Sequence, residues 1–276
     1  MNLSRLISMD LRSVISSIRS TDPKVVLSYF TSTGLRPVIA EEQKEKQKNY
    51  LVSAFWAAIS VSIILGIWPN ALPFSFLQLW STTGSPSDWL TTAAYVFLWG
   101  AGITALVSII THNKPEENRN AEVDFEKGFF ISLWAGVMEE ICFRWLIFMS
   151  SMIGAIVANY IFFGFLGFGI AEWLQIHFLG PIANFFTLGL LQHQLANPEL
   201  WYVGAGILAA NAFFRDGHKY LGFFGFVNSW FIGMFMFYLL FTYGLLSCIL
   251  VHFLYDLAIF AVRYVDCVIE RAQGRV

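Results

Sequence analysis

Long apolar stretches that are almost free of charge limit the folds open to this chain. Between residues 51 and 110 the only charged residue is Asp88, and between residues 128 and 262 there are nine. Soluble domains carry about a quarter charged residues, whereas this chain carries 13%. Apolar runs of about 18 residues or more predict membrane-spanning helices. We therefore expect an all-α, polytopic membrane helical bundle in contact with the lipid bilayer.

Glycine, proline and polar residues divide the apolar sequence into about eight candidate spans. They cover residues 50–68, 89–110, 128–149, 151–170, 174–191, 200–214, 221–241 and 243–262. The last two could form one bent unit, so seven spans is the alternative count. The net charge of -2 argues against nucleic acid as a partner.

The chain divides into four parts by composition. Residues 1–48 form a polar, amphipathic N-terminal segment with eight Lys/Arg and five Asp/Glu. Residues 49–124 hold two spans, residues 125–264 a core of further spans, and residues 265–276 a C-terminal tail. Positive charge favours the cytoplasmic side of a membrane. This places the N-terminus in the cytoplasm, and an even number of spans places the C-terminus there too.

Two adjacent glutamates and an arginine lie inside the span at 128–149. Ionisable groups at membrane depth are expensive and are usually paired or functional. Glu140 and Arg144 are four residues apart, so they share a helix face and can pair. Glu139 projects about 100° away and lacks that partner. It is therefore the candidate base that takes a proton from water.

Two histidines complete the set of ionisable groups in the spans. His218 ends a short apolar stretch. His252 and Asp256 are four residues apart on an apolar helix, where a carboxylate can orient an imidazole. Each histidine is also compatible with a purely structural role.

In order, these residues resemble the three motifs of the CPBP family, the CAAX proteases and bacteriocin-processing enzymes. The motifs are EExxxR at Glu139–Arg144, FxxxH at Phe214–His218 and HxxxD at His252–Asp256. The resemblance covers about residues 125–262. It implies an intramembrane endopeptidase, with an active site that opens toward the cytoplasm and a peptide or membrane protein as substrate.

The resemblance also implies a role for each residue. Glu139 would activate the attacking water and His218 would assist it. His252 and Asp256 would bind the developing oxyanion or orient their neighbours. Glu140 and Arg144 would brace the helix. Because an ionised aspartate cannot donate a hydrogen bond, Asp256 would hold His252, which would be the donor.

A metal requirement is left open by the sequence. Glu139, Glu140, His218 and His252 could ligate zinc, but a metal-free glutamate mechanism uses the same residues. The three cysteines are far apart and suggest no thiolate site.

Two other functions remain compatible with the sequence. A catalytically inactive immunity or scaffold protein could keep the same bundle, because a fold does not fix a function. A proton-coupled transporter could use Glu139, His218 and His252 as a relay, but the chain shows no repeated halves.

Overall fold

The computed structural model describes residues 37–111, 121–219 and 222–273, and all secondary structure within them is helical. Most of the N-terminal segment predicted at residues 1–48 lies outside these residues. The long elements are α3 (Pro37–Ile67), α4 (Pro86–Thr111), α6 (Ala121–Glu139), the π-helix η2 (Glu140–Ile147), α7 (Phe148–Ile161), α11 (Trp201–Gly217), α12 (Gly222–Tyr243) and α13 (Leu245–Ala272).

Four helical stretches in the described residues are long and apolar enough to cross a membrane. They are Pro86–Leu106, Gly128–Ile161, Gly225–Tyr243 and Leu245–Val262. A shorter apolar helix covers Val52–Ile67. The expectation of an all-α bundle associated with a membrane is confirmed at this level, but the count of eight spans is not.

The expected break between residues 149 and 151 is wrong. α6, η2 and α7 follow one another without interruption, and their apolar part is 34 residues long. The polar residue at the expected break is Ser150, whose hydroxyl donates to the carbonyl oxygen of Ile147 at 3.0 Å. A serine that bonds back to its own helix leaves the helix intact.

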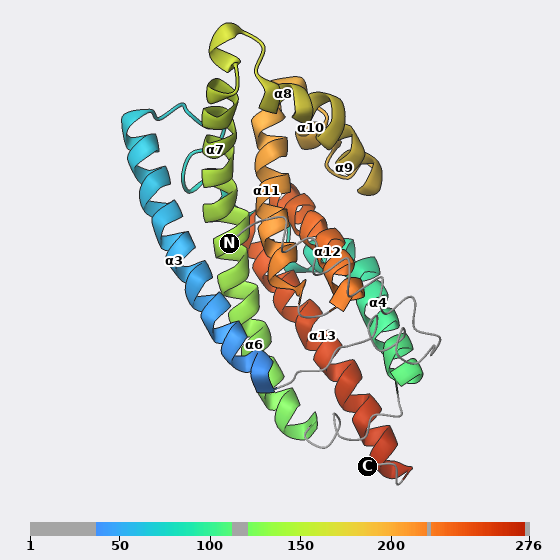
Figure 1. Cartoon of the computed structure of the whole chain (residues 1–276). Helices are drawn as coiled ribbons and strands as arrows, with labels where there is room; N and C mark the ends of the chain where they lie inside the picture. The colour runs from blue at the N-terminus through green and yellow to red at the C-terminus, as the bar shows by residue number, and fades with distance from the viewer. Residues whose placement is uncertain (1–36, 112–120, 220–221, 274–276) are drawn as a thin grey trace, which may run out of the picture.

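The expected span at residues 174–191 is also wrong in its bounds. A helical run of α8 (Ile170–Leu174), the π-helix η4 (Gln175–Leu179) and α9 (Gly180–Phe186) replaces it. The chain then turns through Leu188 and Gly189, both at positive φ, into α10 (Gln192–Leu195). These short helices extend sideways from the adjacent ends of α7 and α11 (Figure 1).

α13 is the central helix of the bundle. It packs along α6 and α4, while α11 packs on α7 and α12 (Figure 1). α12 and α13 are separate helices joined at Gly244, where the chain reverses. The loop before α4 closes this corner, because Thr83 donates from its backbone N–H to the carbonyl of Tyr243 at 3.1 Å and from its hydroxyl to that of Thr242 at 2.8 Å. Carbonyls at a helix end need such partners.

A close approach of α6 and α13 depends on Gly136. A Cβ atom at this position would lie 2.9 Å from the backbone nitrogen of Phe253 and 3.0 Å from the carbonyl oxygen of Ile249. Both neighbours are backbone atoms and cannot rotate away. Gly136 therefore brings the end of α6, and the two glutamates that follow, against α13.

We expect Gly136→Ala to destabilise the protein by about 1–3 kcal/mol, because the added methyl group forces two helices apart. Gly154→Ala is the matched control, since nothing lies within 4 Å of a Cβ there. That change should be neutral or stabilising, because alanine favours a helix. Thermal unfolding in detergent compares the two, and an equal melting temperature for both variants would contradict the close contact.

Candidate functional site

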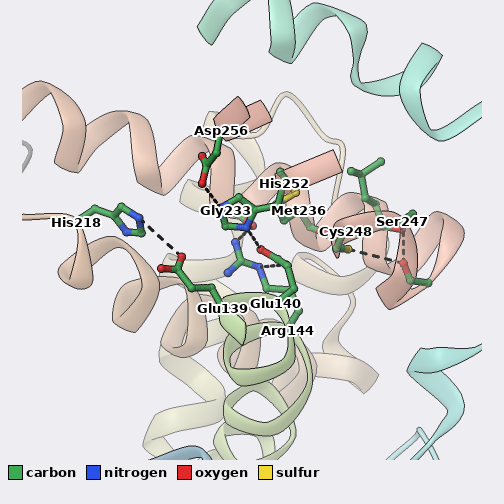
Figure 2. Close-up of polar contacts among 12 residues, drawn as sticks. Glu139, Glu140, Arg144, His218, Gly233, Met236, Ser247, Cys248, His252 and Asp256 are labelled. Carbon is green, nitrogen blue, oxygen red and sulfur yellow. Dashed lines mark hydrogen bonds and ion pairs between the residues drawn. The ribbon is translucent and has the colours of Figure 1, made fainter. Parts of the chain in front are cut away.

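The three sequence motifs meet at one place in the bundle. Glu139 ends α6, Glu140 and Arg144 lie on η2, His218 follows α11, and His252 and Asp256 lie on α13. Figure 2 shows Glu140, Arg144 and His252 joined at the centre of this cluster, with Glu139 facing His218 on one side. Residues that are more than 100 positions apart in the chain are therefore neighbours.

The centre of the site is a buried pair between a glutamate and a histidine. His252 Nδ1 lies 2.6 Å from Glu140 Oε1, and both side chains are almost fully enclosed. Because a carboxylate oxygen accepts, Nδ1 carries the proton and donates it in this bond. This contact ties η2 to α13.

Arg144 completes the buried centre. Its Nε lies 3.2 Å from Glu140 Oε2, and its side chain is fully buried. The guanidinium also lies over the ring of Phe214 at 4.1 Å and over that of Phe237 at 5.5 Å. The expected pairing of Glu140 with Arg144 is confirmed, and the phenylalanine of the second motif packs on it.

Glu139 points away from that centre, as its position in the sequence predicts. Its side chain is 28% exposed, and its Oε2 atom lies 3.9 Å from His218 Nε2. No protein group described in the structure hydrogen-bonds to this oxygen. The glutamate that lacks the arginine is therefore the one that reaches the half-open side of the cluster.

The orientation of His218 follows from its other ring nitrogen. Nδ1 lies 2.8 Å from the carbonyl oxygen of Phe214. A carbonyl can only accept, so Nδ1 donates in this contact. The other ring nitrogen, Nε2, faces Glu139 Oε2 at a distance too long for a direct hydrogen bond.

His252 lies between two carboxylates. Its Nε2 is 3.6 Å from Asp256 Oδ2, whereas its Nδ1 is much closer to Glu140. The sequence predicted Asp256 as the residue that orients this histidine. In the structure Glu140 is the closer partner, and Asp256 approaches the other side of the ring.

The charged residues in and directly after the second motif pair with one another. Arg215 Nη2 lies 2.7 Å from Asp216 Oδ1, and Lys219 Nζ lies 3.0 Å from Asp216 Oδ2. All three are partly or largely exposed. They form a small surface network and do not enter the buried centre.

Sequence reasoning missed two residues that support the site. Gly233 offers its carbonyl to Arg144 Nη2 at 3.5 Å, and Asn211 donates to the carbonyl of Trp230 at 3.0 Å. Asn211 is fully buried, and a Cβ at position 233 would overlap its Oδ1 atom. A lone Asn in an apolar stretch is visible in the sequence, but the sequence does not show which helix it contacts.

The donor set does not suit a zinc ion. Both carboxylate oxygens of Glu140 face cationic or protonated partners, Arg144 and His252. Among the residues described, no three His, Cys, Asp or Glu side chains are placed to hold a metal. The arrangement is that of a partly exposed glutamate beside a buried charged network.

A separate cavity of about 620 Å³ lies away from the motifs. It is lined by residues 189–194, 196 and 197 and by Tyr238, Phe241 and Thr242. None of the motif residues contributes to it, so it has no part in the chemistry of the site.

Comparison with known proteins returned no match. No family model, no curated protein and no solved structure is similar to this chain. The resemblance to the CPBP family therefore remains a prediction based on the three motifs.

Proposed function

We propose that this protein is an intramembrane endopeptidase of the CPBP type that hydrolyses a peptide bond with water activated by Glu139. The observation that carries the proposal is Glu139, a partly exposed glutamate that faces His218 across 3.9 Å beside a buried charged network. A water bound to this carboxylate would present its oxygen lone pair to a substrate carbonyl. General-base catalysis of this kind contributes about 10²–10⁴-fold to a rate.

The reaction follows in two steps. Glu139 takes a proton from the water as its oxygen attacks the carbonyl carbon, which gives a tetrahedral intermediate. The carboxyl group then gives that proton to the leaving nitrogen as the C–N bond breaks. The products are a new carboxylate and a new amine, and Glu139 is ionised again.

In this proposal His252 is the donor that stabilises the oxyanion. Its Nδ1 proton is held by Glu140. Its Nε2 has only the longer contact of 3.6 Å to Asp256. When His252 carries a proton on both ring nitrogens, its Nε2–H can donate to the oxyanion in place of Asp256, and a fixed donor has its largest effect there. Asp256 would keep the ring in place between turnovers.

The same proposal includes a topology. α3 and the 17-residue α11 would cross the bilayer together with the four long apolar stretches. The start of α3 and the end of α13 lie at the same end of the bundle (Figure 1), which agrees with an even number of crossings. We assign that end to the cytoplasm on the charge of the N-terminal segment.

Incubation of the reconstituted protein in H₂¹⁸O tests the reaction. Liposomes with the purified protein would be mixed with solubilised membrane proteins from cells that lack it. We expect new peptide C-termini that carry ¹⁸O with the wild-type protein. The proposal would be refuted if no new termini formed although the protein was folded and an added control protease cleaved proteins of the same extract.

A further inference from the structure

The segment between α7 and α11 exposes an unusual amount of apolar surface. Every large apolar side chain from residue 162 to residue 190 is exposed except Ile176. We call residues 162–190 the apolar lobe. Monomeric soluble proteins rarely expose patches of more than a few hundred Å². The lobe therefore needs a partner that covers it.

The lobe carries a single Asp, Glu, Lys or Arg residue, Glu172, and this residue is bonded within the chain. Asn159 donates to Glu172 Oε2 at 3.2 Å and accepts from the backbone N–H of Glu172 at 2.9 Å. A Cβ at Gly164 or Gly169 would collide with Asn159, so the turn closes tightly around this side chain. The one charged side chain of the lobe is thus hydrogen-bonded to the end of α7.

Two bulky residues at its turns have a left-handed backbone. Phe163 has φ 66° and Leu188 has φ 53°, and the side chain of Leu188 is 91% exposed. Such residues rarely adopt positive φ, because this conformation strains the backbone. In both turns this conformation leaves an apolar side chain on the outside. Water offers no compensation for this, but an apolar phase does.

The connections of the lobe do not allow it to cross a bilayer. The lobe begins at the end of α7 and returns to the start of α11, and both ends lie at the same end of the bundle (Figure 1).

We propose that the apolar lobe is a re-entrant element that inserts into one leaflet and is covered by lipid acyl chains. Lipid is favoured over a protein partner because the lobe continues the exposed apolar surface of α7 at Val157, Tyr160 and Ile161. Glu172 is its only charged residue, and that carboxylate accepts from Asn159, so the lobe presents no charged patch to a protein partner. In the turns of the lobe, the backbone N–H groups of Leu166, Ile170, Leu188 and Leu190 are bonded within the chain, as an apolar surrounding requires. This inference is independent of any catalytic role of Glu139.

Depth-dependent quenching tests the insertion. Single cysteines at Leu188 and Phe165, in a chain without other cysteines, would carry an environment-sensitive fluorophore in phosphatidylcholine liposomes. Leu98→Cys on the exposed face of α4 is the lipid control, and Lys219→Cys is the aqueous control. Spin-labelled lipids and iodide would serve as the two quenchers.

We expect the labels at Leu188 and Phe165 to be quenched by spin-labelled lipid as at Leu98 and protected from iodide. Iodide quenching equal to that at Lys219 would overturn the proposal. The proposal would also be overturned if the labels were protected from both quenchers and unlabelled Leu188→Cys proteins formed cross-links that disappear on dilution in lipid. A second copy of the chain would then cover the lobe.

Discussion

Glu139→Gln is expected to lower the rate of peptide-bond cleavage by about 10²–10⁴-fold, since an amide cannot serve as a general base. The stability of the protein should change little. The Glu139 side chain is partly exposed, and its contact with His218 is 3.9 Å long. The rate of product formation and the melting temperature of the same preparation measure the two effects separately.

Glu172→Gln is the matched control for that change. It is also a partly buried glutamate, but it bonds to Asn159 of α7 and lies outside the three motifs. We expect it to leave cleavage within a few-fold of the wild type. Equal losses in Glu139→Gln and Glu172→Gln, or full activity in Glu139→Gln, would remove Glu139 from the mechanism.

Arg144→Met should have the largest effect on stability. It leaves the buried Glu140 carboxylate without its cation, and loss of one partner from a buried pair typically costs about 3–5 kcal/mol. It also removes the guanidinium that lies over Phe214 at 4.1 Å. Reversible unfolding in mixed micelles gives the change in the free energy of unfolding.

Two further variants separate the buried pair from charge in general. Arg215→Met breaks a partly exposed pair with Asp216 and should cost no more than about 1 kcal/mol. Arg144→Met combined with Glu140→Gln removes the orphan charge and should recover part of the lost stability. A small effect of Arg144→Met, similar to that of Arg215→Met, would mean that the buried network does not hold η2 to α13.

The division of labour between the two glutamates could be predicted from the sequence. Four-residue spacing places Glu140 and Arg144 on one helix face, and the residue before them necessarily turns away. The structure places Glu139 on the half-open side and Glu140 in the buried centre. Local periodicity was sufficient because both relations lie within one helix.

The bond between Glu140 and His252 could not be predicted in this way. It joins residues 112 positions apart and depends on how α6 and α13 pack. The sequence offered only the near neighbour Asp256 as a partner for His252. Gly233 and Asn211 were missed for the same reason, since their roles depend on the contact of α11 with α12.

The expected span bounds failed where apolar composition was the only signal. Hydropathy identifies the apolar parts of α4, α12 and α13, although α13 continues as a helix beyond its apolar part. It cannot tell a crossing helix from the apolar lobe, because both are apolar throughout. The turns at Phe163 and Leu188 occur at residues that seldom adopt positive φ, so residue type gave no warning of them.

The most direct test of Glu139-dependent proteolysis compares protein termini across the proteome. Cells that lack this protein would be rescued with the wild type or with Glu139→Gln at matched membrane levels. We predict new termini with the wild type alone, which would also identify the substrate. Identical termini in both, with the phenotype rescued by both, would contradict the account and mean that the protein acts by binding.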